Sequence, residues 1–214
     1  MILYSEINVL ADCNLNNWVN FLPPAMRNEI RRKKFLSDQK ATLIGRLMLF
    51  HNLKREGRIN LIAEWQRDQS NKPYINGWKF FNISHSYEIV VFASDDKSIG
   101  IDIERLEEIN YLEISEHFHI QEREFIMNAE CTQSAFYEIW VKKEAFLKAV
   151  GIGITNGLKE FNCIGDEVRY KAHIWYFQKL EIHKDYMCYL CTSKKEYNII
   201  INEFHLDNVY LLYN

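Results

Sequence analysis

The chain has 214 residues, of which 48% are hydrophobic and 14% aromatic, so it can build an apolar core and is not intrinsically disordered. A formal net charge of −3 excludes the strong positive field that is typical of nucleic-acid-binding proteins. No apolar run approaches the roughly 20 residues of a membrane span, the start predicts a strand and not a signal peptide, and five scattered cysteines suit reduced thiols. We therefore expect a cytoplasmic protein without membrane or nucleic-acid partners.

The spacing of apolar residues predicts strands at both ends of the first part of the chain and helices between them. Short apolar runs mark the strands, whereas the longer stretches repeat apolar residues every three or four positions. We expect a strand at residues 2–10, helices at 25–36 and 38–55, and strands at 60–65, 78–83 and 88–93.

The second part of the chain repeats this order of elements. We expect a strand at residues 98–104, helices at 111–118, 122–129 and 134–150, and strands at 167–177, 186–192 and 198–203. The repeats divide near residues 95–97, which gives a first half (residues 1–96) and a second half (residues 97–214). This order predicts the α+β class with two similar α/β half-domains, and clefts between half-domains are common places for small-molecule sites.

The segment Ile99-Gly-Ile-Asp-Ile-Glu104 alternates strictly between isoleucine and other residues. In a strand, the isoleucines point to one face, while Gly100, Asp102 and Glu104 point to the other. Carboxylates two residues apart on a strand lie roughly 6.5–7 Å apart at Cα, so both can reach one divalent cation. Taken alone, the motif is also typical of a solvated strand face.

The segment Trp140-Val-Lys-Lys-Glu-Ala-Phe-Leu-Lys148 has helical spacing, because Trp140, Glu144 and Lys148 recur every four residues on one face. This helix can present a third carboxylate and an ammonium group along one line. A surface ion pair between Glu144 and Lys148 is the simpler interpretation of the segment alone. Together with the strand motif, the segment favours a magnesium ion that is held against a diphosphate.

These motifs and two others, in this order, closely resemble those of the 4′-phosphopantetheinyl transferases: Lys72-Pro73, Asn82-Ile-Ser-His-Ser86, Ile99 to Glu104, and Trp140-x-x-Lys-Glu-x-x-x-Lys148. The resemblance is to the larger single-chain type, which activates synthetases of surfactin-like peptides. It implies two similar α+β halves that are related by a pseudo-twofold axis, with the active site at their interface.

The resemblance also implies the reaction. The 4′-phosphopantetheine group passes from coenzyme A to a serine hydroxyl of an apo acyl or peptidyl carrier protein, with Mg²⁺ as cofactor and release of 3′,5′-adenosine bisphosphate. We expect the enzyme to be a monomer. The carrier that it modifies and its tolerance for acylated coenzyme A stay open.

The resemblance assigns roles to the acidic residues and to Lys148. Asp102 and Glu104 match metal ligands, and Lys148 matches a lysine that contacts the diphosphate. Glu144 matches a third acid, which is either a ligand or the base that deprotonates the incoming serine.

A fourth carboxylate is expected in Phe118-His-Ile-Gln-Glu-Arg-Glu124, where Glu122 stands at the matching position. A small shift of the alignment would exchange Glu122 for Glu124. Two exposed acids in the first turn of a helix, where the helix dipole favours them, explain the segment equally well.

Coenzyme A contacts are expected in the first half. Ser84 and His85 match a pair that grips the phosphates, since both side chains can donate hydrogen bonds. Lys72, which Pro73 holds in an extended approach, matches a lysine that contacts a phosphate. In the basic stretch at residues 27–34, Arg31 aligns with a lysine near the 3′-phosphate, and Thr42 aligns with a residue beside the adenine. A turn histidine, a loop lysine and a solvated basic helix face are the plain alternatives.

Two positions depart from the family pattern. Tyr87 stands where glycine is common, and Gly151-Ile-Gly153 lacks the lysine that is often found between these glycines. The segment at residues 151–159 presents Ile152, Ile154 and Leu158 next to the catalytic helix, so it is the expected docking surface for the carrier, with a loop packed onto the core as the alternative.

Other functions stay open alongside the transferase. The same acids could serve another magnesium-dependent enzyme of phosphate esters, and the basic stretch at residues 27–34 could serve a non-catalytic binding module. Cys188 and Cys191 do not suggest a metal or redox pair, because residues three apart in a strand face opposite sides.

Overall fold

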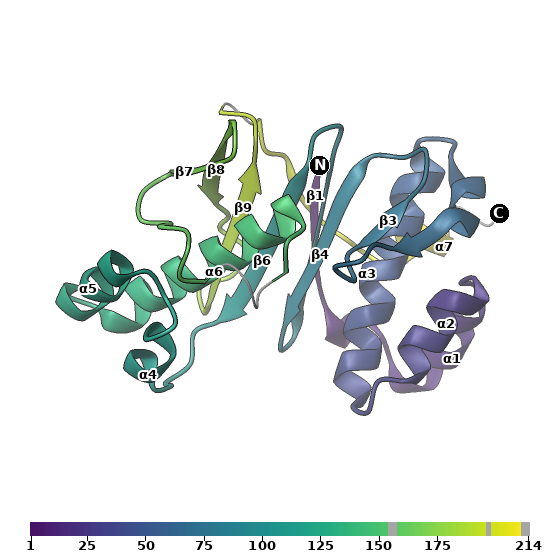
Figure 1. Ribbon diagram of the computed structural model, residues 1–214. Helices are drawn as coiled ribbons and strands as arrows, with labels where there is room; N and C mark the ends of the chain where they lie inside the picture. The colour runs from purple at the N-terminus through teal and green to yellow at the C-terminus, as the bar shows by residue number, and fades with distance from the viewer. Residues whose placement is uncertain (154–157, 196–197, 211–214) are drawn as a thin grey trace.

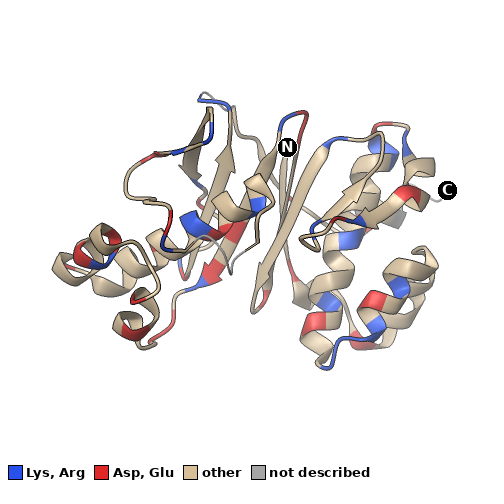
Figure 2. Ribbon diagram, viewed as in Figure 1, with Lys and Arg blue, Asp and Glu red and all other residues tan. Residues whose placement is uncertain are grey.

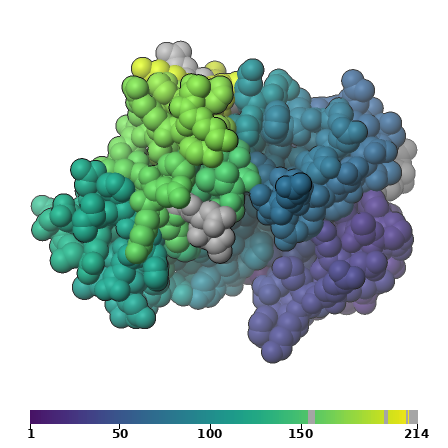
Figure 3. Space-filling model, viewed as in Figure 1, coloured from purple at the N-terminus to yellow at the C-terminus, as the bar shows by residue number. Residues whose placement is uncertain are grey.

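The computed structural model describes residues 1–153, 158–195 and 198–210. The described residues form two four-stranded sheets, each with its own group of helices (Figure 1). In the space-filling view, the purple-to-blue first half and the green second half form the two sides of the molecule (Figure 3). Within the described ranges, no helix combines the length and the hydropathy of a membrane-spanning segment.

The first half begins with a strand, continues through three α-helices and ends in four strands. These elements are β1 (Ile2–Glu6), α1 (Leu15–Asn20), α2 (Pro24–Arg31), α3 (Leu36–Arg55), β2 (Trp65–Arg67), β3 (Pro73–Ile75), β4 (Phe80–Ser86) and β5 (Ile89–Asp95). The strand expected at residues 60–65 is wrong, because Ile59–Glu64 is a 3₁₀ helix that packs Ile59, Leu61 and Ile62 on the core. Residues 7–10 likewise leave β1 for the 3₁₀ helix Ile7–Val9.

The second half repeats the strand, three helices and strands of the first. Its elements are β6 (Ile99–Arg105), α4 (Tyr111–Ser115), α5 (Ile120–Asn128), α6 (Thr132–Val150), β7 (Glu167–Tyr170), β8 (His173–Lys179) and β9 (Tyr186–Thr192). The single strand expected at residues 167–177 is a hairpin, since β7 and β8 pair antiparallel on either side of Lys171 and Ala172.

Three strands of each sheet follow the same order, β1-β5-β4 in the first and β6-β9-β8 in the second. In the first sheet, with the order β10-β1-β5-β4, strand β1 pairs antiparallel with β5. In the second sheet, with the order β6-β9-β8-β7, strand β6 pairs antiparallel with β9. In both halves the first strand therefore lies beside the last strand of the repeat, and the predicted α+β fold with two similar halves is confirmed.

The end of the chain returns to the first half. Strand β10 (Ile201–Glu203) pairs in parallel with β1, and helix α7 (Asp207–Tyr210) follows it. Phe204 and Val209 are buried in the core of the first half. The division at residue 97 therefore describes the order of the chain, but the last described residues complete the first sheet.

Three hydrophobic clusters hold the layers together. One joins α3 to the first sheet, one joins α6 to the second sheet, and the third lies between the two sheets. Ile99, Ile101 and Ile103 belong to the third cluster, so the face predicted for the isoleucines of β6 is confirmed. The opposite face of β6 lies against α6.

Strands β4 and β6 lie side by side where the halves meet (Figure 1). The two strands are not paired by backbone hydrogen bonds; side chains of β4 bond to backbone amides of β6 instead. The Asn82 Oδ1 atom accepts from the Ile101 amide at 2.8 Å, and Ser86 Oγ accepts from the Arg105 amide at 3.1 Å. The polar residues of the Asn-Ile-Ser-His-Ser segment therefore tie the first half to the strand that carries the carboxylates.

Candidate active site

Three carboxylates meet at the junction of the halves. Asp102 and Glu104 of β6 and Glu144 of α6 each offer an oxygen, and these oxygens lie within 4.8 Å of one another. We call them the acidic cluster. Figure 2 shows the acidic stretch of β6 beside charged positions of α6. The structure thus brings together the three carboxylates that the two sequence motifs predicted.

Backbone packing sets this geometry. Gly100 lies so close to α6 that an added Cβ would stand 2.0 Å from the carbonyl oxygen of Ala145 and 2.5 Å from the amide nitrogen of Ala149. Because only glycine fits there, α6 can approach β6 closely enough for Glu144 to reach the strand's carboxylates.

Hydroxyl groups of β4 orient two of the carboxylates. Ser84 Oγ donates to Asp102 Oδ1 at 2.7 Å, and Ser86 Oγ donates to Glu104 Oε2 at 2.7 Å. The second oxygen of Asp102, Oδ2, is buried and has no hydrogen-bond partner among the described residues. A buried carboxylate oxygen without a donor is costly, so this atom is suited to a cation.

The acidic cluster shifts the pKa values of its members. Burial, followed by repulsion from Asp102, raises the pKa of Glu144 to about 7. The same two causes raise the pKa of Glu104 above its usual value. Both shifts show that negative charge is crowded at this point, and a bound cation would relieve the crowding.

Lys148 lies one turn beyond Glu144 and partly neutralises the cluster. Its Nζ is 2.5 Å from Asp102 Oδ1, 3.3 Å from Glu144 Oε2 and 3.1 Å from Ser84 Oγ. Burial lowers the pKa of Lys148, but Asp102 and Glu144 outweigh it and raise the value to about 12. The ammonium group is therefore charged at neutral pH.

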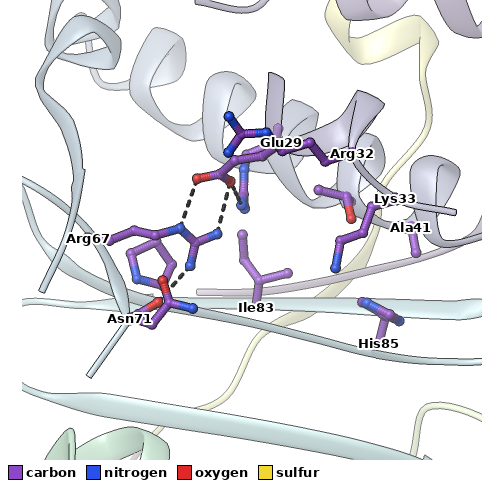
Figure 4. A pocket seen from close by; sticks show the side chains of 11 residues that line it. Glu29, Arg32, Lys33, Ala41, Arg67, Asn71, Ile83 and His85 are labelled. Atoms are coloured by element: carbon purple, nitrogen blue, oxygen red, sulfur yellow. Dashed lines mark hydrogen bonds and ion pairs between the residues drawn. The ribbon is translucent and has the colours of Figure 1, made fainter. Parts of the chain in front are cut away.

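A cavity of about 600 Å³ opens in the first half, on the other side of β4 (Figure 4). Four cations and one carboxylate line it; we call it the cationic cavity. Its lining residues are Glu29, Arg32, Lys33, Ala41, Thr42, Arg46, Arg67, Asn71, Pro73, Ile83 and His85. Such a cavity suits an anionic ligand of the size of a nucleotide.

The single carboxylate of this cavity, Glu29, is shared by two arginines. Arg67 donates to both of its oxygens at 2.8 and 2.9 Å, and Arg46 donates to Oε2 at 3.0 Å. Although burial raises the pKa of Glu29, these hydrogen bonds lower it to about 2. Arg32 and Lys33 form no ion pair with any described residue, so their charge is available to a ligand.

Of the predicted coenzyme A contacts, Thr42 and His85 line the cationic cavity. The Ser84 hydroxyl instead donates to Asp102 of the acidic cluster. Arg31 is not brought to the cavity: it is the last residue of α2, and its guanidinium donates to Asn20 Oδ1 at 3.3 Å. The following residues, Arg32 and Lys33, are the members of the basic stretch that line the cavity.

Arg46 and Arg67 were missed by sequence reasoning. Arg46 is only 5% exposed, and its guanidinium carbon lies 4.1 Å from the centre of the Trp65 ring. The sequence did carry a signal for Arg46, which stands among the apolar residues of a long helix. Arginine is rarely buried without a partner, so this position indicates an ion pair.

A second cavity, of about 290 Å³, adjoins the cationic cavity. It shares Asn71, Pro73 and Ile83 with the cationic cavity and is also lined by Lys72 and Lys148. Lys72 Nζ donates to the backbone carbonyls of Lys148 at 2.5 Å and Ile99 at 3.4 Å, and burial lowers its pKa to about 8. Lys72 therefore joins the halves at the wall of this second cavity, which also reaches Lys148, the partner of the acidic cluster.

Glu122 does not join the acidic cluster. It is fully buried and forms an ion pair with Lys143 Nζ at 2.7 Å. Its two oxygens also accept from the amides of Cys163 at 2.7 Å and His119 at 2.9 Å, the latter as part of a capping box. The carboxylate is thus used to hold the start of α5 in place. Glu124 is exposed on the same helix.

The expected docking segment is only partly described. Ile152 and Leu158 are half-buried and pack against the core of the second half, while Ile154 lies outside the described residues. Cys188 and Cys191 lie in different clusters, on opposite faces of the second sheet, as the spacing in the strand predicted.

Protein-family models match almost the whole chain. The model described as "4′-phosphopantetheinyl transferase superfamily" matches residues 98–200. The model described as "4′-phosphopantetheinyl transferase, N-terminal" matches residues 11–97. The two matches thus meet at the junction of the halves.

Curated relatives give the same answer. The 4′-phosphopantetheinyl transferase psf-1 of Bacillus pumilus is 30% identical over 73% of this chain and 71% of its own length. The 4′-phosphopantetheinyl transferase Sfp of Bacillus subtilis is 30% identical over 68% of this chain and 67% of its own. A solved structure, the holo-[acyl-carrier-protein] synthase of Thermotoga maritima, has 15% identity and a TM-score of 0.35 over 46% of this chain and 64% of that one, which is too weak to argue from.

Proposed function

The chain belongs to the 4′-phosphopantetheinyl transferase superfamily, and we propose that it transfers 4′-phosphopantetheine from coenzyme A to a serine hydroxyl of an apo carrier protein. The observation that carries this proposal is the junction itself. Three carboxylates and Lys148 meet there, and Lys148 also lines a cavity that adjoins the cationic cavity of about 600 Å³. Coenzyme A fits this arrangement, because its diphosphate links a 3′-phosphorylated adenosine, which suits the cationic cavity, to a pantetheine arm.

Asp102, Glu104 and Glu144 fit a magnesium ion. Their oxygens are hard donors of the kind that this ion prefers, they converge within 4.8 Å, and the buried Oδ2 of Asp102 has no hydrogen-bond donor among the described residues. We assign Asp102 and Glu104 as its ligands, and Glu144 as either a third ligand or the base that deprotonates the carrier serine. When bound, the ion supplies positive charge against the negative charge that develops on the diphosphate.

The protein's own residues bind the diphosphate and accept the proton of the carrier serine. Lys148 binds the diphosphate through its ammonium group, which the neighbouring Ser84 hydroxyl helps to orient. If Glu144 is not a ligand, its carboxylate lies beside Lys148 and the other two acids, where it can accept the proton of the carrier serine. The serine oxygen then bonds to the β-phosphorus, and 3′,5′-adenosine bisphosphate leaves.

The adenosine bisphosphate end binds in the cationic cavity. Arg32 and Lys33 bind the 3′-phosphate with charge that no described carboxylate already neutralises. Thr42 and His85 line the same space and offer hydrogen bonds to the nucleotide. All of these groups come from one chain, so we propose that the enzyme acts as a monomer.

Mass spectrometry of apo carriers tests the proposal. Apo acyl and peptidyl carrier proteins are incubated with the protein, coenzyme A and Mg²⁺, and nucleotide release is measured in parallel. We expect at least one carrier to gain the phosphopantetheine mass, with equimolar 3′,5′-adenosine bisphosphate. Nucleotide release that does not require a carrier would instead show a hydrolase of phosphate esters.

Replacing Glu144 by glutamine separates its two roles. A ligand role predicts that Glu144→Gln weakens binding of Mn²⁺, a spectroscopic substitute for Mg²⁺, together with turnover. A role as base alone predicts normal Mn²⁺ binding, with turnover reduced by the 10²–10⁴-fold that is typical of a lost general base.

A further inference from the structure

The turn between β4 and β5 has an unfavourable residue at a position that suits glycine. Ser86 and Ile89 are paired, so Tyr87 and Glu88 form a two-residue turn. Tyr87 has φ of 48°, in the left-handed region, which costs a residue with a side chain roughly 1–2 kcal/mol. Tyr87 thus departs from the family pattern, in which glycine is common at this position. The tyrosine must therefore gain contacts that offset this cost.

Those contacts cross to the other half. The Tyr87 hydroxyl donates to Glu107 Oε2, and the Arg105 guanidinium carbon lies 4.8 Å from the centre of the Tyr87 ring. Arg105 ends β6, and Glu107 follows it. The hydrogen bond and the cation–π contact together hold the tip of the first half's hairpin on the end of β6.

The stretch that Tyr87 contacts is fixed on its other side by helices of the second half. The amide of Glu107 donates to the Tyr137 hydroxyl of α6 at 3.1 Å, and the Tyr111 hydroxyl of α4 donates to the Glu107 carbonyl at 2.6 Å. Tyr87 therefore connects the β4–β5 turn to the framework that also carries Glu144.

Glu104 immediately precedes Arg105, the residue of β6 that contacts the Tyr87 ring. It is the least buried of the three carboxylates, and it stands near the end of its strand. Its neighbour across the junction, Ser86, immediately precedes Tyr87 and bonds both the Glu104 carboxylate and the Arg105 amide. Because Ser86 is next to the turn, a shift of the turn would move Ser86. The hydrogen bond from Ser86 orients the Glu104 carboxylate, so that carboxylate would move as well.

We propose that Tyr87 is a positioning residue, which locks the β4–β5 turn onto the end of β6 so that Ser86 holds Glu104 in place for the metal ion. This inference rests on the proposed metal site. It explains why a strained tyrosine is kept in the turn, since partners of a ligand fix the orientation and affinity of the site.

Binding of Mn²⁺ to the full-length protein, measured by electron paramagnetic resonance without coenzyme A or carrier, tests the inference. Tyr87→Phe removes the bond to Glu107, and Tyr87→Gly removes all side-chain contacts while relieving the strain. We expect the Mn²⁺ dissociation constant to rise about threefold in the first and about tenfold in the second. The KM for coenzyme A, measured at saturating Mg²⁺, stays unchanged in both.

Lys171→Gly is the matched control. Lys171 occupies the corresponding position of the β7–β8 turn with φ of 54°, and neither that turn nor its residues belong to the acidic cluster. Glycine there relieves the same strain, so the melting temperature is equal or higher and Mn²⁺ affinity is unchanged.

The outcomes separate the inference from the proposed function. If the unmodified protein binds Mn²⁺ and Tyr87→Gly binds it equally well, the positioning role is overturned and the metal site stands. If the unmodified protein binds no Mn²⁺, the metal site itself fails. Because Tyr87 acts through Ser86, Ser86→Ala with Tyr87→Gly should weaken binding by less than the product of the single effects; multiplicative effects would contradict the mechanism.

Discussion

Gly100 of β6 and Ala145 of α6 are in direct backbone contact, since a Cβ at position 100 would lie 2.0 Å from the Ala145 carbonyl oxygen. The contact sets the separation between the strand that carries Asp102 and Glu104 and the helix that carries Glu144. It lies on the same face of β6 as both carboxylates. The packing of two small residues thus determines whether three acids can share one cation.

We expect Gly100→Ala to push α6 away and to reduce transfer by at least about 100-fold, because a displacement of about 1 Å can cost that much. Gly45→Ala is a control for crowding alone, since its Cβ would meet the Ile83 Cγ2 methyl at 2.8 Å; because Ile83 lines both cavities, this variant is compared by its Mn²⁺ binding. Gly100→Ala is measured by transfer kinetics and by Mn²⁺ binding. Normal Mn²⁺ binding by folded Gly100→Ala would show that the helix tolerates the displacement.

Asp102→Ala should abolish transfer and leave the fold intact. Its side chain lies on the polar face of β6, so its removal leaves the apolar cluster between the sheets unchanged. It also deprives the cation of a ligand and Lys148 of its closest partner. Carrier modification measured at saturating Mg²⁺, with circular dichroism as the folding check, decides the matter. Transfer near that of the unmodified protein would remove Asp102 from the metal site.

Replacing Arg32 and Lys33 with alanine should raise the KM for coenzyme A more than that for 3′-dephospho-coenzyme A. The reason is that both cations line the cavity without an ion pair to any described residue. Arg31→Ala is the control, because Arg31 contacts Asn20 instead, and it should leave both constants within about twofold. Equal effects on the two substrates would show that these cations bind something other than the 3′-phosphate.

Glu29 should make the free energy of unfolding depend on pH in the acid range. Arg67 and Arg46 lower its folded pKa from 4.5 to about 2, so its stabilising contribution is complete above about pH 4.5 and is lost as the pH falls towards 2. We expect Glu29→Gln to be less stable by about 1–2 kcal/mol at pH 7 and the difference to shrink over that window. Urea unfolding at several pH values measures it. A difference that is constant from pH 7 to pH 2 would show that the ion pairs do not contribute.

Local spacing predicted the acidic cluster because its members need only two elements. The alternation of β6 and the four-residue repeat of α6 each fix a face, and one close contact at Gly100 brings the faces together. The cationic cavity was harder to predict. Glu29, Arg46 and Arg67 come from α2, α3 and β2, and no local pattern shows that these elements converge.

Arg31 shows how an element boundary limits such predictions. Helix α2 ends at this residue, so the chain direction changes just where the basic stretch continues, and helical spacing no longer tells which cation faces α3. At Glu122, by contrast, a local signal existed. His119 and Glu122 have the spacing of a capping box, but histidine is not one of the preferred N-cap residues.

The return of β10 to the first sheet has a consequence during synthesis. The ribosome makes residues 201–210 after all of the second half's helices and strands, yet Phe204 and Val209 fill the core of the half that is made first. Until these residues have been made, the β1 edge that later pairs with β10 is open and the first half lacks part of its interior. The nascent chain therefore cannot finish its first half before its second half, and a gene cut at residue 97 would separate the first half from its own last strand.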